Sequence, residues 1–479
     1  MKRSLVFPFL LILLTAIGQN DGYEIAINFK PFKNQYVYLG HYFGAKQYPI
    51  IDSVMLDNNS HAIFKGPKKL GRGIYLLGFP NRNGFYELLM DFNQKFTITI
   101  DTSSSPGGMR FDHSDYNTEF VAYQRYMGEK GQAITDVKNK LGMTTSAADS
   151  AKLNAQLKKL DSDITRYRDS LIHKNPTGIL GRLLKGMEEP VVPPAAKHPG
   201  GKYDSAFAYR YYKSHYWDGV DFWDDLFART TFFEGKLDKY FESVITPIAD
   251  SVIKEMDLMM SYASISPDMN RFLLTKFINR YYNQKYMWED AVFVHLYEKY
   301  LANKDYSWMN ANGKKMITDR AYSLMANIFG TPAADIELPD STGKKISLYT
   351  ISSPFTLVCF WDATCGHCKE TLPKIDSFYT AKWRASGLKI YSVSKETSGT
   401  IDDWKSFIRD NKLNWVNVYY TKAEEKARVT GGIPGYSQLY DVQSFPTLYL
   451  LDKDKRIIAK KLTYQQMDDI LTLKLKGSN

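Results

Sequence analysis

The sequence predicts an α/β C-terminal domain, with a central mixed sheet flanked by helices, that follows a small antiparallel β domain and an all-α domain. Three patterns support this fold class. Apolar residues alternate with a period of two as far as about residue 105, from Asp115 they recur at helical spacing, and after Gly330 strand and helix patterns alternate. The predicted boundaries are 1–18 for a signal peptide, 19–110 for the β domain, 111–330 for the helical domain and 331–479 for the α/β domain.

Length and composition agree with a folded, multidomain protein. The 479 residues suit about three domains. With 34 Tyr, 27 Phe and 8 Trp, the chain has enough aromatic side chains for several hydrophobic cores. The net charge is +10, but Lys and Arg are scattered among acidic residues and form no basic stripe. We therefore expect no nucleic acid among the partners.

The N-terminus is typical of a secretory signal peptide. Met1-Lys2-Arg3 is basic, Leu5 to Ala16 is apolar, and small residues precede Gln19. The apolar run is shorter than the roughly 20 residues of a membrane helix, and a buried first strand is the alternative. We expect a mature protein that does not span a membrane and that is located in the periplasm or cell envelope.

Residues 22 to about 105 show strand patterns. The alternating runs are Ile25-Ile27-Phe29, Tyr36-Tyr38 and Phe96-Ile98-Ile100. Between them, Asp57-Asn58-Asn59 predicts a hairpin turn. The block therefore predicts a small antiparallel β domain.

The central region shows helical patterns. Apolar residues recur at spacings of three and four, which predicts an amphipathic helix that pairs as a hairpin with the helix before it. These residues are Leu153, Leu157, Leu160, Ile164, Tyr167 and Leu171. Pro190 to Gly201 predicts a loop. The aromatic segment Tyr209 to Tyr240 is interpreted as core or interdomain packing, with a groove for a sugar or peptide as the alternative.

Cys365-Gly366-His367-Cys368 is the segment whose spacing indicates a chemistry. It follows the apolar run Phe355 to Trp361 and precedes a helical pattern, so the pair is expected at a helix N-terminus. There the free N–H groups and the helix dipole stabilise a thiolate. The pair is a candidate redox centre. With Cys359, the chain has only three cysteines, too few to staple an exported protein with disulfides.

The elements after this motif follow in a definite order. The first is a helix, predicted from the helical spacing of Leu372, Ile375, Tyr379 and Lys382. A half-buried strand at Leu388 to Val393 and a helix at Asp402 to Asp410 follow. The remaining predicted elements are strands at Val416 to Tyr420, Leu448 to Leu451 and Ile457 to Lys460, and a terminal helix. Phe445-Pro446 stands directly before a strand, about eighty residues after the cysteines. This position resembles that of the cis-proline of thioredoxin-like proteins, so we predict a cis peptide bond there, beside the dithiol.

From about Gly330 onward, the chain resembles the thioredoxin-like domain of the TlpA/ResA group of bacterial envelope disulfide reductases. The resemblance is carried by Thr331-Pro332-Ala333-Ala334-Asp335, Phe360-Trp361, Cys365 to Cys368, Pro373 and Phe445-Pro446-Thr447. Residues 22–330 are similar to the N-terminal and helical regions of multidomain members from Gram-negative envelopes. Those regions carry no assigned activity.

This resemblance implies roles for particular residues. Cys365 is the expected nucleophile and Cys368 the resolving thiol, while Gly366 and His367 tune the redox chemistry, with His367 favouring the Cys365 thiolate. The expected substrate-contacting residues are Trp361, Phe445, Pro446 and Thr447. The implied partners are disulfide-containing proteins and, for a reductase, a separate electron donor in the membrane.

The chain departs from the family pattern beside the resolving thiol. Members of the family usually have Glu three residues after the second cysteine, where this chain has Thr371, and thioredoxin has a buried acid where this chain has Cys359. Which group deprotonates Cys368 stays open. Cys359 is interpreted as a small buried hydrophobe, with a third redox cysteine as the alternative.

The CxxC motif has other possible chemistries. A structural zinc site needs four ligands, and c-type haem needs His where this chain has Lys369, so no metal and no cofactor are expected. A purely structural disulfide is the remaining alternative for the pair. For the whole chain, a disulfide oxidase or isomerase stays open, because protein disulfide isomerase has the same Gly-His spacer. A docking protein of an envelope complex stays open as well.

Overall fold

The computed structural model describes residues 22–102 and 108–476, so the predicted signal peptide lies outside the described residues. The chain divides into two compact units, one that runs to Ile245 and includes Leu258–Leu273, and one formed by Thr246–Asp257 and the chain from Leu274 onward. None of the helices in the described ranges is both long and apolar enough to cross a membrane. The domain boundaries expected from the sequence stay a prediction.

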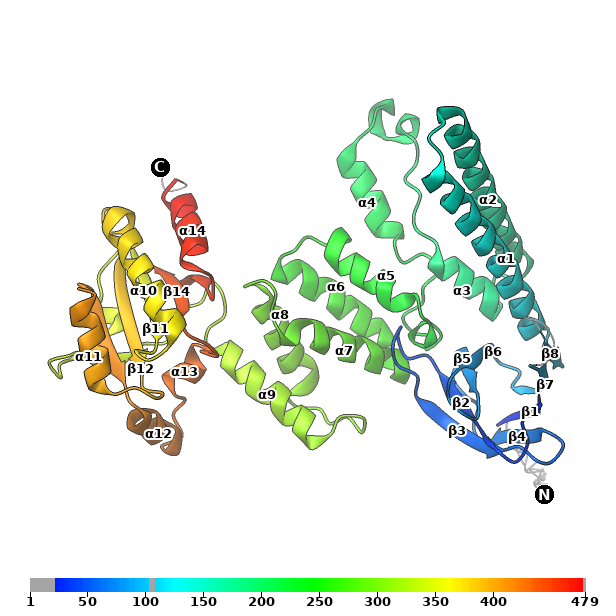
Figure 1. Ribbon diagram of the computed structural model, residues 1–479, viewed down its shortest axis with the longest axis horizontal. Helices are drawn as coiled ribbons and strands as arrows, with labels where there is room; N and C mark the ends of the chain where they lie inside the picture. Colours follow the sequence, from blue (N-terminus) through cyan, green and yellow to red (C-terminus); the bar gives the residue numbers. More distant parts are fainter. Residues whose placement is uncertain (1–21, 103–107, 477–479) are drawn as a thin grey trace, which may run out of the picture. The chain divides into compact units, whose positions relative to one another are not determined.

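Unit 1 begins with two four-stranded sheets, of strand order β4-β1-β7-β8 and β3-β2-β5-β6 (Figure 1). The strands are β1 (Tyr23–Lys30), β2 (Tyr36–His41), β3 (Ile50–Met55), β4 (His61–Gly66), β5 (Gly73–Gly78), β6 (Phe85–Met90), β7 (Lys95–Asp101) and β8 (Met109–Asp112). All pairings are antiparallel except β1 with β7. The two sheets share one apolar cluster, which confirms the predicted β region.

The alternation seen in the sequence buries one face of each strand. Ile25, Ile27 and Phe29 of β1 are buried. In β2 the core is reached by Val37 and Leu39, while Tyr36 is exposed. The predicted hairpin at Asp57-Asn58-Asn59 is wrong. This turn leads from β3 to β4, but β3 pairs with β2 in one sheet and β4 pairs with β1 in the other.

The helical part of unit 1 starts with a long helical hairpin, as predicted from the leucine spacing. Its helices are α1 (Asp115–Met143) and α2 (Ala147–Lys174), followed by α3 (Ile179–Met187), α4 (Ser205–His215), α5 (Phe233–Lys239), α6 (Ala249–Tyr262) and α7 (Pro267–Tyr282). Helices α6 and α7 contribute residues to both units. Only Asn117, Phe120 and Leu171 of the hairpin are fully buried, so most of its surface faces solvent.

Most of the aromatic segment from Tyr209 to Tyr240 packs into a core, as interpreted from the sequence, while Tyr209 is 45% and Trp223 is 52% exposed. Tyr216, Phe233 and Tyr240 are at most 2% exposed, and their rings contact neighbouring aromatic rings edge-on or at a tilt. A surface groove for a sugar would need these rings in solvent.

Unit 2 contains α8 (Glu289–Leu296) and α9 (Ala311–Met325), followed by a five-stranded sheet of order β13-β12-β11-β14-β15. The C-terminal elements are β9 (Glu337–Pro339), β10 (Lys345–Ser347), β11 (Phe355–Trp361), α10 (Gly366–Phe378), β12 (Lys389–Lys395), α11 (Ile401–Asp410), β13 (Val416–Tyr420), α12 (Lys422–Thr430), α13 (Tyr436–Leu439), β14 (Thr447–Asp452), β15 (Ile457–Lys460) and α14 (Tyr464–Lys476). One apolar cluster joins α10, α11 and α14 to one face of the sheet, and another joins α13 and the β9–β10 hairpin to the other face (Figure 1).

The predicted elements of this sheet agree with the structure to within two residues, but one expectation was wrong. Strand β12 was expected to be half-buried, yet all its residues from Ile390 to Ser394 are buried. The reason is its central position: it pairs in parallel with both β11 and β13, and helices and loops cover both faces. The sequence did not predict α12 and α13.

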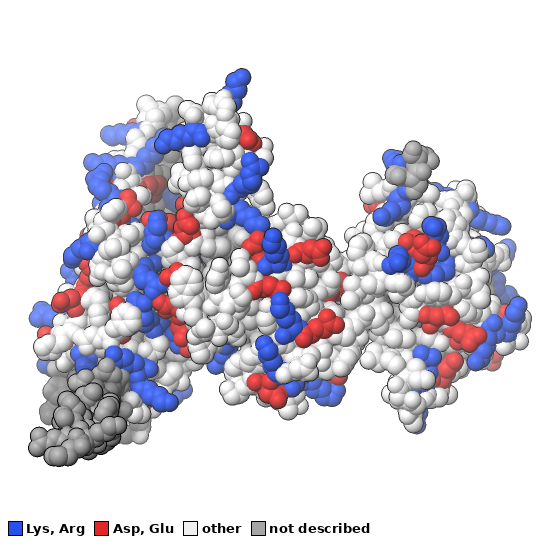
Figure 2. Space-filling model, turned by 180° about the vertical axis from the view of Figure 1, so that it is seen from behind, with Lys and Arg blue, Asp and Glu red and all other residues white. Residues whose placement is uncertain are grey.

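Charged side chains are mixed over the surface. On the face shown in Figure 2, basic and acidic residues alternate over both units. This pattern is that of a solvated surface, as the scattered charges in the sequence indicated.

Within unit 2, a buried ion pair joins the helical segment that contains α8 and α9 to the edge of the sheet. Lys460 Nζ of β15 lies 2.5 Å from Asp290 Oδ2 of α8, and these side chains are 5% and 1% exposed. Lys460 Nζ also donates to the carbonyl and the side-chain oxygen of Asn327. Burial lowers the pKa of the Lys460 amine, and Asp290 opposes this shift.

We predict that Asp290→Ala destabilises unit 2 by about 3–5 kcal/mol, because it leaves the buried Lys460 charge without its carboxylate. A urea titration of unfolding measures this. The double variant with Lys460→Met should recover most of the loss. As a control, Asp319→Ala breaks an exposed pair with Lys315 and should cost less than about 1 kcal/mol. A similar cost for both aspartates would contradict the assignment.

Candidate active site

The two cysteines are mounted at the junction of β11 and α10. Strand β11 ends at Trp361, and Cys365 occupies the N-cap of the helix that starts at Gly366. Cys365 Sγ accepts a hydrogen bond from the Cys368 N–H at 3.4 Å. A helix N-terminus leaves such N–H groups free, so the local geometry stabilises negative charge on this sulfur.

The two thiols differ in exposure. Cys365 is partly exposed, whereas Cys368 is 0% exposed and Cys359 is 2% exposed. Burial raises the pKa of the Cys368 thiol far above its ordinary value; a backbone hydrogen bond at Asp362 opposes the shift, and the Cys365 and Cys359 sulfurs add to it. Burial alone raises the pKa of Cys359 to about 12. The accessible thiol is therefore Cys365, as predicted.

The surroundings of Cys368 supply few acidic groups. Thr371 is buried one turn along α10, and Cys359 belongs to the same apolar cluster as Cys368. The sequence-based interpretation missed one buried acid, Asp362, which is 3% exposed. Its carboxylate accepts hydrogen bonds from the Thr364 N–H and hydroxyl. Its signal in the sequence was an acid directly after an apolar strand.

The loop before β14 completes the site. Phe445-Pro446 is a cis peptide, which confirms the prediction. Cys365 Sγ lies 3.9 Å from the Phe445 carbonyl oxygen. This contact follows from the sheet register, because Thr447 at the start of β14 pairs with Phe360 near the end of β11. Among the described residues, the Phe445 N–H has no hydrogen-bond partner.

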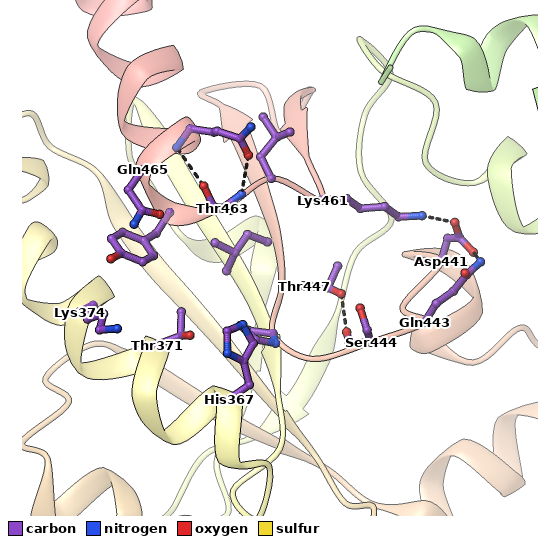
Figure 3. Close-up of a pocket in the computed structure, with 15 residues that line it drawn as sticks. His367, Thr371, Lys374, Asp441, Gln443, Ser444, Thr447, Lys461, Thr463 and Gln465 are labelled. Carbon is purple, nitrogen blue, oxygen red and sulfur yellow. Dashed lines mark hydrogen bonds and ion pairs between the residues drawn. The ribbon is translucent and has the colours of Figure 1, made fainter. Parts of the chain in front are cut away.

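A cavity of about 550 Å³ opens between α10 and this loop (Figure 3). His367, Thr371 and Lys374 line one side of it at helical spacing. The opposite side is lined by residues that were not among the predicted site residues. They gave no local signal because they come from separate loops and from the start of α14: Gln443, Ser444, Lys461, Thr463 and Gln465. The lining combines polar side chains with apolar surface such as that of Pro446 and Leu448, which suits an extended peptide.

The structure brings most of the predicted site residues together. Cys365, His367, Pro446 and Thr447 lie around the cavity or the loop beside it. Trp361 does not: it is 0% exposed, and its indole N–H donates to Ser392 Oγ at 2.6 Å. This placement corrects the expectation that Trp361 contacts substrate, because a side chain at the end of a central strand packs into the core.

We predict that alkylation of the reduced protein near pH 7 labels Cys365 first. The partly exposed sulfur reacts, while buried Cys359 and Cys368 stay neutral and covered. Iodoacetamide labelling followed by peptide mass mapping measures the order. Cys365→Ser should lose the fast label, and fast labelling of Cys368 in the folded protein would refute the assignment.

Two regions of the chain match known families. Residues 329–460 match the AhpC/TSA family, and residues 147–321 match a domain of unknown function, DUF5106. Thiol-disulfide oxidoreductase ResA of Bacillus thuringiensis is 26% identical over 146 residues, which cover 30% of this chain and 76% of that protein. Sporulation thiol-disulfide oxidoreductase A of Bacillus subtilis is 28% identical over 146 residues, 30% of this chain and 71% of that protein.

A solved structure gives a further likeness to the C-terminal part. A domain of a possible thiol-disulfide isomerase from Cytophaga hutchinsonii is 33% identical and covers 31% of this chain and 94% of that chain, with a TM-score of 0.27. The AhpC/TSA match and the two curated relatives show that the C-terminal part of this chain is a thioredoxin-like domain, homologous to the ResA and TlpA thiol-disulfide oxidoreductases, that follows a β domain and a DUF5106 domain.

Proposed function

We propose that this protein is an exported disulfide reductase that acts on envelope proteins through Cys365 and Cys368. One observation supports the proposal most: a partly exposed thiol at a helix N-terminus stands beside a buried second thiol. An exposed thiol attacks and a nearby buried thiol resolves, which is the division of labour that thiol–disulfide exchange needs.

The chemistry proceeds in two exchanges. The Cys365 thiolate attacks one sulfur of the substrate disulfide, a mixed disulfide forms, and the first substrate thiolate leaves and takes up a proton. The Cys368 thiol then loses its proton, and the thiolate attacks Cys365 Sγ, which releases the second substrate thiol. Two electrons pass to the substrate, and the protein is left with a Cys365–Cys368 disulfide.

The cis-proline loop is suited to hold the substrate chain during these steps. The Phe445 N–H has no partner among the described residues, and the Phe445 carbonyl faces Cys365. An extended peptide can pair with such free backbone groups. Pro446 and Thr447 line the adjoining cavity, and Thr447 Oγ1 is fixed by donating to the Ser444 carbonyl at 2.6 Å.

A reductase in an oxidising compartment needs a source of electrons. The Cys365–Cys368 disulfide must be reduced again by a dithiol donor, and we place that donor in the membrane as a separate protein. Export is proposed from the basic and apolar N-terminal segment of residues 1–18.

The second candidate function is that of a disulfide oxidase or isomerase, which the Gly366-His367 spacer favours. The redox state in the cell separates the two. Acid quenching followed by alkylation should find Cys365 and Cys368 mainly reduced in the envelope if the protein is a reductase. A dithiol found mainly as disulfide would replace the reductase with an oxidase.

We predict that Cys368→Ser traps substrates as mixed disulfides on Cys365, because the resolving sulfur is missing. Non-reducing gels of envelope extracts, followed by mass spectrometry, identify the trapped proteins. The matched control Cys365→Ser should trap nothing. If a folded Cys368→Ser variant captures no protein, the redox function is rejected and the role as a docking protein of an envelope complex remains.

We also predict a pH dependence of the resolving step. The raised pKa keeps the Cys368 thiol protonated at neutral pH, so its thiolate fraction grows about tenfold for each unit of rising pH. In single turnovers, release of the second substrate thiol should accelerate with a slope near one in log rate between about pH 6 and 9. A second phase that does not change with pH would point instead to a local base, such as Asp362.

A further inference from the structure

A second cavity adjoins the one that contains His367. Its volume is about 490 Å³, and the loop between α7 and α8 and Arg320 of α9 line part of it. The residues that line both cavities are Gln443, Lys461, Leu462 and Gln466. The two cavities therefore share a wall within unit 2, and together they lead from His367 and Pro446 to helices α8 and α9.

The helical segment holds this shared wall in place. Arg320 Nη1 donates to Asp441 Oδ2 at 2.6 Å, with side chains only 10% and 4% exposed. Asp441 also pairs with Lys461 and accepts from Gln443 Nε2 at 2.9 Å. A buried ion pair thus connects α9 to the stretch that leads into the cis-proline loop. The groove is built jointly by the helical segment and the thioredoxin-like domain.

The charges along the two cavities do not balance. The lining contains five cationic side chains, Lys285, Arg320, Lys374, Lys460 and Lys461, and two carboxylates, Asp290 and Asp441. Both carboxylates are buried and paired. Lys374 in the first cavity and Lys285 in the second are exposed, and neither has an ion-pair partner among the described residues. The groove therefore presents uncompensated positive charge in each cavity.

We propose that the two cavities form one substrate groove, which accepts an extended disulfide-bearing polypeptide with acidic residues flanking its reactive cysteine. The proposal rests on the proposed thiol–disulfide exchange and adds the class of substrate. It also assigns a role to the part of the DUF5106 match that contains Lys285 and Arg320, namely recognition of substrate beyond the thioredoxin-like domain.

Two peptides test the proposal on the full-length protein. Each has one cysteine linked as a disulfide to 2-mercaptoethanol, with aspartates either within three residues of the cysteine or five to eight residues away. Relative to neutral peptides of the same length, both should be reduced about two- to fivefold faster per paired lysine at low salt. Near 1 M salt, where the Debye length is roughly 3 Å, the preference should vanish.

Charge-reversal variants assign the two ends of the groove. With protein reduced beforehand, so that Cys365 and Cys368 supply the two electrons of a single turnover, Lys374→Glu should lower the second-order rate constant for the peptide with near aspartates about fivefold. Lys285→Glu should do the same for the peptide with distant aspartates. Lys405→Glu is the matched control, because Lys405 is exposed on α11, lines neither cavity and should leave both rates unchanged.

A small neutral disulfide separates this inference from the proposed function. Lys405→Glu should reduce hydroxyethyl disulfide at the wild-type rate, Lys374→Glu and Lys285→Glu should lose less of that rate than of the rate with their acidic peptide, and Cys365→Ser should not reduce it. Wild-type reduction with no preference for acidic peptides, or equal losses in Lys405→Glu and Lys285→Glu, would overturn the groove and leave the redox function. Failure of the wild-type protein to reduce any of these disulfides would overturn both.

Discussion

The position of the reactive thiol depends on one strand that is buried on both faces. Leu357 and Cys359 of β11 belong to the apolar cluster under α10, and Val358 and Phe360 belong to the cluster on the other face. Because both faces are packed, the register of β11 against β14 is strongly specified. That register places the cis-proline loop beside the end of β11, where helix α10 begins. Fold and chemistry therefore share the same constraint.

The thioredoxin-like domain also depends on the helices that precede it. Met287 packs against its core, Asp290 neutralises the buried Lys460, and Arg320 holds Asp441. These contacts join residues more than a hundred positions apart in the chain. The compact unit accordingly begins before the thioredoxin-like sequence pattern does.

Sequence reasoning succeeded where local pattern decides the structure. The CxxC spacing, the apolar run before it and the proline before a strand predicted the dithiol, its helix and the cis bond at Pro446. It failed where the tertiary fold decides which elements contact each other. The turn sequence Asp57-Asn58-Asn59 is the same whether the two strands beside it pair with each other or with different strands. The position of Trp361 at a strand end does not show whether its side chain is buried. The second cavity had no local signal, since the Arg320–Asp441 pair joins residues 121 positions apart.

The lack of an acidic side chain at positions 359 and 371 shifts the balance between the two exchange steps. A resolving thiol whose proton is held by burial leaves more time for the mixed disulfide with the substrate. In the proposed exchange, contacts along the groove hold the partner in place during that time. A slow second step and an extended recognition surface are therefore compatible features of one enzyme.

Strand β15 lies at one edge of the sheet, and its own chain covers its free side. Ile457 exchanges backbone hydrogen bonds with Gly330 and Thr331, Lys455 accepts from Ala333, and the Lys460 N–H points to the sulfur of Met287. An uncovered edge strand is a template for pairing with another molecule, and hence for aggregation. The segment that enters the thioredoxin-like domain thus occupies the hydrogen-bonding positions that another chain would need in order to pair with β15.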